Sequence, residues 1–182
     1  MIHWRLIMQK MFWVDLEMTG LDVAKDVILE VAVVVTNLQL EELARYEAVV
    51  FQTPAVLAAM DPWCIETHGK SGLTAAVSKG KPLKDVEQDL IKIARDHFPN
   101  EKIILCGNSV GTDKKFLDAG MPLFARHLHY RIVDVSSWKE IFNSVYGMVF
   151  QKRELHRAVD DILESIGELA YYQSFISAKK VI

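Results

Sequence analysis

In the first third of the chain, short apolar and β-branched runs separated by turn residues are typical of β-strands. Residues 11–14 form a short apolar run that enters a turn at residues 19–20. Residues 27–36 are rich in β-branched side chains, which indicates a mostly buried strand. Asn37 offers a turn before a third strand over 43–51, which we expect to run antiparallel to the second. The first third is therefore predicted to supply three strands.

The remainder alternates helical stripes with two short strands. Apolar residues recur at three- and four-residue spacing over 83–94, which predicts a helix, and a second helix is expected over 113–119. Strands are expected at 103–106 and 130–135, and a last helix carries one apolar face over 159–170. This order predicts an α/β fold, with a mixed five-stranded sheet flanked by α-helices.

Length and composition describe one globular domain over residues 1–182. The hydrophobic fraction of 51% and the charged fraction of 25% exclude a disordered chain. The longest apolar run, residues 55–60, is far shorter than the roughly twenty residues of a membrane span, so no membrane partner is expected. The start lacks the features of a secretory signal, and Cys64 and Cys106 are interpreted as reduced thiols, so we expect a cytoplasmic protein.

The charge balance limits the kind of ligand. The net charge is −3, from 21 basic and 24 acidic residues. A protein that binds long nucleic acid through many phosphates usually has a basic excess. Either nucleic acid is not the ligand, or the ligand is short. The acidic excess also leaves carboxylates available to bind metal ions.

The first candidate for chemistry is the pair Asp15 and Glu17. Side chains two apart on a strand project from the same face, so the two carboxylates repel each other unless a cation lies between them. A hard divalent cation such as Mg²⁺ or Mn²⁺ prefers carboxylate oxygen. The alternative is an exposed acidic edge. Four apolar residues precede the pair, which favours a buried strand.

Two further segments carry acidic residues. Asp113 follows a Gly- and Ser-containing loop at a helix start, where an ordinary first-turn or capping role is an alternative to metal binding. His156 precedes Asp160 and Asp161. At about 100° per residue, Asp160 would lie about 40° and Asp161 about 140° from His156 around a helix. Helix geometry alone therefore favours Asp160 as the partner of His156.

Five segments together resemble a known family: residues 13–21, 67–73, 107–110, 129–136 and 156–162. Their order is similar to that of the DEDDh group of 3′→5′ exonucleases, and within it to the oligoribonucleases. The similarity begins near residue 11, so residues 1–10 are expected to be a variable N-terminal extension. The resemblance implies a ribonuclease-H-like fold, and an enzyme that degrades very short RNA, especially dinucleotides, to 5′-mononucleotides.

The resemblance also assigns roles to residues. It implies that two divalent ions, Mg²⁺ or Mn²⁺, bind to Asp15, Glu17, Asp113 and Asp161, and that His156 is the general base. Asp161 is the ligand in this assignment rather than Asp160, which is consistent with geometry if His156 precedes the helix. The implied substrate-binding residues are Leu21, Trp63, His68, Ser109, Tyr130, Arg131 and Ser136, with Tyr130 supplied by the second subunit of a homodimer.

Two other functions compete with this one. The first is a DEDDh exonuclease that acts on longer DNA or RNA ends. The second is a non-catalytic RNA-binding relative of the same fold. A metal-free acid/base mechanism of the glycosidase type, built on Asp15 and Glu17, is a third possibility that a chelator would exclude.

Overall fold

The computed structural model describes residues 8–151 and 157–177. Its centre is a five-stranded sheet in the order β3-β2-β1-β4-β5. β1, β2 and β3 are antiparallel neighbours, whereas β4 runs parallel to β1, and β5 parallel to β4. The predicted mixed sheet is therefore confirmed. The strands are β1 (Lys10–Met18), β2 (Ile28–Asn37), β3 (Glu42–Val49), β4 (Ile103–Gly107) and β5 (Leu128–Asp134).

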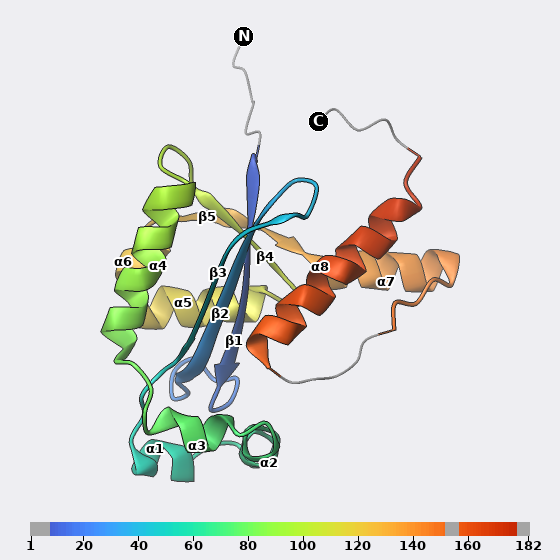
Figure 1. Cartoon of the computed structure of the whole chain (residues 1–182). Helices are drawn as coiled ribbons and strands as arrows, with labels where there is room; N and C mark the ends of the chain where they lie inside the picture. The colour runs from blue at the N-terminus through green and yellow to red at the C-terminus, as the bar shows by residue number, and fades with distance from the viewer. Residues whose placement is uncertain (1–7, 152–156, 178–182) are drawn as a thin grey trace.

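Helices cover both faces of this sheet. The three predicted helices are present as α4, α5 and α8, and α4 and α8 lie on opposite sides of the sheet (Figure 1). The sequence pattern did not predict the short helices α1–α3, which gather where β1 ends, nor α6 and α7. The helices are α1 (Pro54–Ala58), α2 (Pro62–Lys70), α3 (Leu73–Val77), α4 (Leu83–His97), α5 (Gly111–Gly120), α6 (Pro122–Ala125), α7 (Val135–Tyr146) and α8 (Ala158–Ser174).

None of the helices in the described part of the chain is both long enough and apolar enough to cross a membrane.

The alternation of side chains along β1 decides which helix faces the acidic pair. Even-numbered residues of β1 pack with α4 and α5 in one core cluster, whereas odd-numbered Met11 and Trp13 pack with α8 in another. Asp15 and Glu17 continue the odd-numbered series. The two carboxylates therefore project from the face of the sheet that α8 covers.

β1 extends past its pairing with β4 on the side where both strands end. The two strands pair only at Phe12 and Trp13 of β1. Gly107 ends β4, and a Cβ atom at this position would lie 2.9 Å from the Val14 carbonyl oxygen, so this close approach requires glycine. Beyond it β4 has ended, and β1 continues to Met18 without pairing with β4. The carboxyl ends of parallel strands are the usual place for a ligand site in an α/β sheet.

Candidate metal centre

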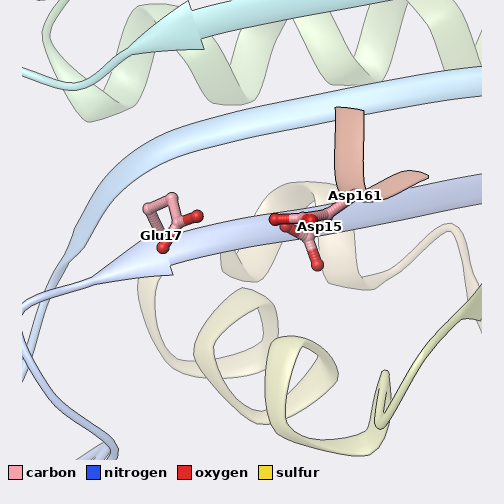
Figure 2. Close-up of side chains that lie close together, drawn as sticks. All are labelled: Asp15, Glu17 and Asp161. Atoms are coloured by element: carbon pink, nitrogen blue, oxygen red, sulfur yellow. The ribbon is translucent and has the colours of Figure 1, made fainter. Parts of the chain in front are cut away.

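Three carboxylates from two distant segments meet on the α8 face of β1. Asp15, Glu17 and Asp161 each offer an oxygen atom, and these atoms all lie within 4.8 Å of one another. Figure 2 shows Asp15 and Glu17 along β1 and Asp161 entering from the helix. All three side chains are half-buried. Asp160 is not in this group. Asp15 and Glu17 lie close together because they are two residues apart on one strand. Asp161 lies beside them only because α8 packs on the sheet.

The start of α8 explains why Asp161 occupies this position. The helix begins at Ala158, and Arg157 before it has an extended backbone. The backbone N–H of Asp161 donates to the Arg157 carbonyl at 3.0 Å, which places Asp161 in the first turn. Because Arg157 is extended, a helical wheel drawn for α8 ends at Ala158 and gives no angle for residue 156. His156 itself lies outside the described residues.

Asp113 lies beside this group on α5. It is buried, and its Oδ1 accepts a hydrogen bond of 3.0 Å from the backbone N–H of Leu16, between the two acidic residues of β1. This N–H lies beyond the last pairing of β1 with β4, so the carboxylate takes the place of a strand partner. Asp113 is therefore held against the backbone of the acidic pair, and it is not in the group of three.

Burial and mutual repulsion change the acidity of these groups. Burial raises the pKa of Glu17 to about 8, and the negative charge of Asp161 adds to the rise. Glu30 and Asp113 act in the same direction, whereas Arg157 lowers the pKa. Burial likewise raises the pKa of Asp113 to about 7. Without a bound cation, the site therefore holds protons at neutral pH.

His68 contacts the acidic pair from α2. Its Nε2 lies 2.9 Å from the Met18 carbonyl oxygen, and because a carbonyl only accepts, Nε2 carries the proton and donates it. Nδ1 then faces Glu17, at 3.8 Å from Oε2. The side chain is almost completely buried. The structure thus places the His68 ring between the Met18 carbonyl and the Glu17 carboxylate. Its predicted role in binding substrate stays a prediction.

The predicted phosphate-binding serines converge on one carboxylate. Asp134 Oδ1 accepts hydrogen bonds from the backbone N–H of Ser109 at 2.9 Å and from the backbone N–H of Ser136 at 3.0 Å. The Ser136 hydroxyl donates to the same oxygen at 2.6 Å. Ser109 has a left-handed backbone, with φ at 52°. Asp134 caps α7 and joins the two predicted serine segments, although the sequence analysis did not select it.

The other predicted substrate residues lie on the surface. Trp63, at the start of α2, is 61% exposed, and Leu21 is 79% exposed. The backbone N–H of Asp61, which caps α2, donates to the Thr19 carbonyl at 2.9 Å and so docks this helix against the end of β1. Exposed apolar side chains of this size suit stacking against a base.

Tyr130 and Arg131 lie on β5. The side chain of Tyr130 is 75% exposed, and the Arg131 guanidinium lies over its ring at 5.4 Å from the ring centre. The backbone N–H of Arg131 donates to His129 Nδ1 at 3.0 Å. The pair therefore presents an aromatic ring and a cation together on the surface.

A buried polar network connects the serine loop with α8. The Asn108 side-chain amide donates to Ser165 Oγ and to Glu168 Oε2, each at 2.9 Å. Ser165 in turn donates to the Asp161 carbonyl at 2.8 Å. The loop of Ser109 and the helix of Asp161 are thus joined by hydrogen bonds. The sequence signal for these residues was present, since Ser165 and Glu168 are polar residues within the apolar stripe of the last helix.

Comparison with known proteins agrees with this architecture. Residues 12–169 match the RNase_T family, described as Exonuclease. A zinc-bound complex of E. coli ExoI with single-stranded DNA has a TM-score of 0.72 at 13% identity, over 91% of this chain and 40% of that chain. A 3′-exonuclease that recognises a histone mRNA stem-loop has a TM-score of 0.63 at 16% identity, over 92% of this chain and 64% of that chain. The fold is therefore ribonuclease-H-like, and the chain belongs to the RNase_T exonuclease family.

Relatives of higher sequence identity show to which group within the exonuclease family the chain belongs. The human protein named "Oligoribonuclease, mitochondrial" is 46% identical over 179 residues, which cover 95% of this chain and 76% of the relative. A probable oligoribonuclease of Dictyostelium discoideum is 45% identical over 169 residues, covering 91% and 89%. The oligoribonuclease of Francisella tularensis is 40% identical over 167 residues, covering 90% and 93%. Within the exonuclease family the chain is thus one of the oligoribonucleases, nucleases of the hydrolase class, and the resemblance based on its five motifs is confirmed.

Proposed function

We propose that the protein is a 3′→5′ exoribonuclease that degrades very short RNA, dinucleotides above all, to 5′-mononucleotides by two-metal-ion hydrolysis. The observation that carries the proposal is the meeting of Asp15, Glu17 and Asp161 within 4.8 Å. Asp113 is held beside them against the β1 backbone. Family membership supports the reaction class, exonucleolytic hydrolysis of RNA, and its 3′→5′ direction.

The donor set suits hard divalent cations. Every candidate ligand is a carboxylate, the ligand type that Mg²⁺ and Mn²⁺ prefer. The raised pKa of Glu17 shows how unfavourable it is to ionise this group without a compensating cation. Asp15, Glu17, Asp113 and Asp161 would hold two Mg²⁺ or Mn²⁺ ions. Such ions orient an attacking water, offset charge on the phosphate and assist the leaving 3′ oxygen.

The chain's own side chains supply the rest of the chemistry. His156 is assigned from the sequence as the base that accepts the proton of the attacking water at a ring nitrogen. Leu21 and Trp63 would enclose the bases of the substrate, since both are exposed beyond the end of β1. His68 would keep its ring against Glu17 and so support the base-binding end of the site.

Substrate length would be limited at the 5′ end. Ser109 and Ser136, which share Asp134, would receive the 5′ phosphate together with Arg131. A dinucleotide has only one or two phosphates, so a net charge of −3 is compatible with its binding. A site that encloses the 5′ phosphate would exclude longer strands sterically.

A homodimer completes this proposal. Tyr130 is 75% exposed, and α7 presents Ile141, Val145 and Tyr146 at 55%, 66% and 61% exposure. Apolar side chains gathered on one helix are typical of an interface. A second copy of the chain would cover them and bring its Tyr130 to the neighbouring substrate. We place the protein in a reducing compartment, the cytoplasm, because Cys64 and Cys106 are buried free thiols.

The test is product analysis on 5′-labelled RNAs of two to ten nucleotides, with and without Mg²⁺. We expect the dinucleotide to be cleaved fastest, with complete loss of activity in a chelator. Asp15→Asn should nearly abolish turnover without changing the melting temperature, whereas the matched Asp160→Asn should remain active. Faster cleavage of the ten-nucleotide RNA than of the dinucleotide would favour an exonuclease for longer strands. Binding without hydrolysis in every metal would favour the non-catalytic alternative.

A further inference from the structure

Glu30 is a buried acid in the middle of a strand. It lies in β2 between Leu29 and Val31, its side chain is 0% exposed, and it pairs in register with Glu17 of β1. A fully buried carboxylate is unfavourable unless it is paired with a charge and hydrogen-bonded. Its partners therefore indicate why this position is acidic.

Those partners lie at the start of α8. The Arg157 guanidinium donates to Glu30 Oε1 at 2.8 Å, and the backbone N–H of Ala158 lies 3.4 Å from Oε2. Arg157 occupies the N-cap position of α8, where its own side chain makes no capping bond. Glu30 thus does from the sheet what a capping side chain does within a helix. Arg157 also donates to Glu47 Oε1 of β3 at 2.9 Å.

These contacts determine where the helix begins relative to the sheet. α8 packs across β2 and β1 (Figure 1). Asp161 follows Arg157 by four residues, and its N–H donates to the Arg157 carbonyl. A displacement of this turn by one residue would rotate Asp161 about 100° around the helix and away from β1. The oxygen separations of the carboxylate group therefore depend on where this first turn is held.

We propose that Glu30 and Arg157 are positioning residues for Asp161, and that their pairing holds the first turn of α8 at the distance from β1 that metal binding requires. The inference rests on the proposed metal site. It predicts that metal affinity falls when the pair is broken, although neither side chain needs to bind the ion. Partners behind metal ligands typically change affinity by about 10- to 100-fold when removed.

The chain offers a matched control in Glu87. This glutamate of α4 is also buried, and its Oε1 accepts from the backbone N–H groups of Leu123 and Phe124 at the start of α6. Glu87 therefore caps a helix across the tertiary structure as Glu30 does. It belongs to the α4 side of the sheet, opposite the carboxylate group. Glu87→Gln reports what the loss of a buried capping charge does to stability alone.

The sign of the effect separates positioning from charge. Removal of a positive charge near three carboxylates would, by Coulomb's law alone, strengthen cation binding. Positioning predicts the opposite for Arg157→Met, because Asp161 loses its anchor. Glu30→Gln weakens binding in either case. Arg157→Met is therefore the informative variant. Because this variant leaves the buried Glu30 without its cation and could fail to fold, the double variant Glu30→Gln/Arg157→Met tests the same proposal without a buried unpaired charge.

The experiment measures Mn²⁺ binding to the full-length protein by the electron paramagnetic resonance signal of free Mn²⁺, alongside the melting temperature and dinucleotide hydrolysis. We expect Arg157→Met and the double variant to bind Mn²⁺ at least about tenfold more weakly, with partial recovery in Arg157→Lys. Glu87→Gln should lower the melting temperature and leave binding unchanged. At saturating Mn²⁺, kcat should fall more than KM rises.

Two outcomes would overturn the inference. Tighter Mn²⁺ binding in Arg157→Met would show a field effect, and unchanged binding in the double variant would show a purely structural pair. Asp161→Asn distinguishes these results from a failure of the proposed function. If Asp161→Asn binds Mn²⁺ as the unmodified chain does, the proposed metal site itself is wrong. If Asp161→Asn loses Mn²⁺ binding but the Glu30 and Arg157 variants keep it, only the positioning role is contradicted.

Discussion

Metal binding should release protons at neutral pH, because the carboxylates that we propose as ligands are not fully ionised without the ion. Burial raises the pKa of Glu17 to about 8, and the pKa of Asp113 to about 7. A carboxyl with a pKa of about 8 is protonated in about nine molecules of ten at pH 7, so a bound cation must displace about 0.9 proton from Glu17. Asp113, half protonated at that pH, adds about half a proton.

The pH dependence of affinity follows from the same numbers. Between pH 7 and pH 8 the ionised fraction of Glu17 rises about fivefold, so the apparent affinity for Mn²⁺ should rise by about the same factor from this group. Asp113 contributes a further factor of about two. Proton release should meanwhile fall from about 1.4 at pH 7 to about 0.6 at pH 8. Carboxyls with ordinary pKa values would release almost none.

Titration calorimetry in two buffers of different ionisation enthalpy counts the protons directly. Glu17→Gln should reduce release at pH 7 to about half a proton, and Asp160→Asn should leave it unchanged, because Asp160 is not in the carboxylate group. Release below about 0.3 proton at pH 7, with clear Mn²⁺ binding, would refute the reasoning. It would mean that Glu17 is already ionised in the metal-free protein.

Four further outcomes are expected. Asp161→Asn should lose almost all hydrolysis of a dinucleotide while Asp160→Asn keeps most of it, and the reverse ranking in a Mn²⁺ titration would contradict the placement of α8. Trp63→Ala should raise KM for dinucleotides by about tenfold with little change in melting temperature, since the side chain is 61% exposed and the loss of one stacked base is about 1–3 kcal/mol. Without metal, the stability that Glu17 contributes is fully present below its ordinary pKa of 4.5 and is lost as the pH rises through about 8. The melting temperature of the metal-free protein should therefore fall over that pH range, and Mn²⁺ should restore it. Leu90→Ala, in the fully buried core under α4, should cost about 2–5 kcal/mol of unfolding free energy and leave the Mn²⁺ affinity unchanged.

Local sequence was sufficient for the features that depend on side-chain periodicity. The period of two along β1 predicted that Asp15 and Glu17 share a face, and the structure places both on the α8 side of the sheet. The β-branched run of β2 and the apolar stripe of α4 were long enough to identify their elements. Short helices such as α1 and α3, of five residues each, have too few apolar positions to show a period.

Tertiary packing decided which residues meet. The helical wheel favoured Asp160, because it assumed that residue 156 is helical. Arg157 is extended, so the wheel of α8 starts at Ala158, and Asp161 is the residue that reaches β1. Glu30 and Arg157, 127 positions apart, make the contact that holds this helix start. A pattern along the chain specifies the face of an element, whereas the meeting of two elements depends on packing across the whole domain. Burial of His68, and the raised pKa of Glu17 beside it, exist only once those elements have met.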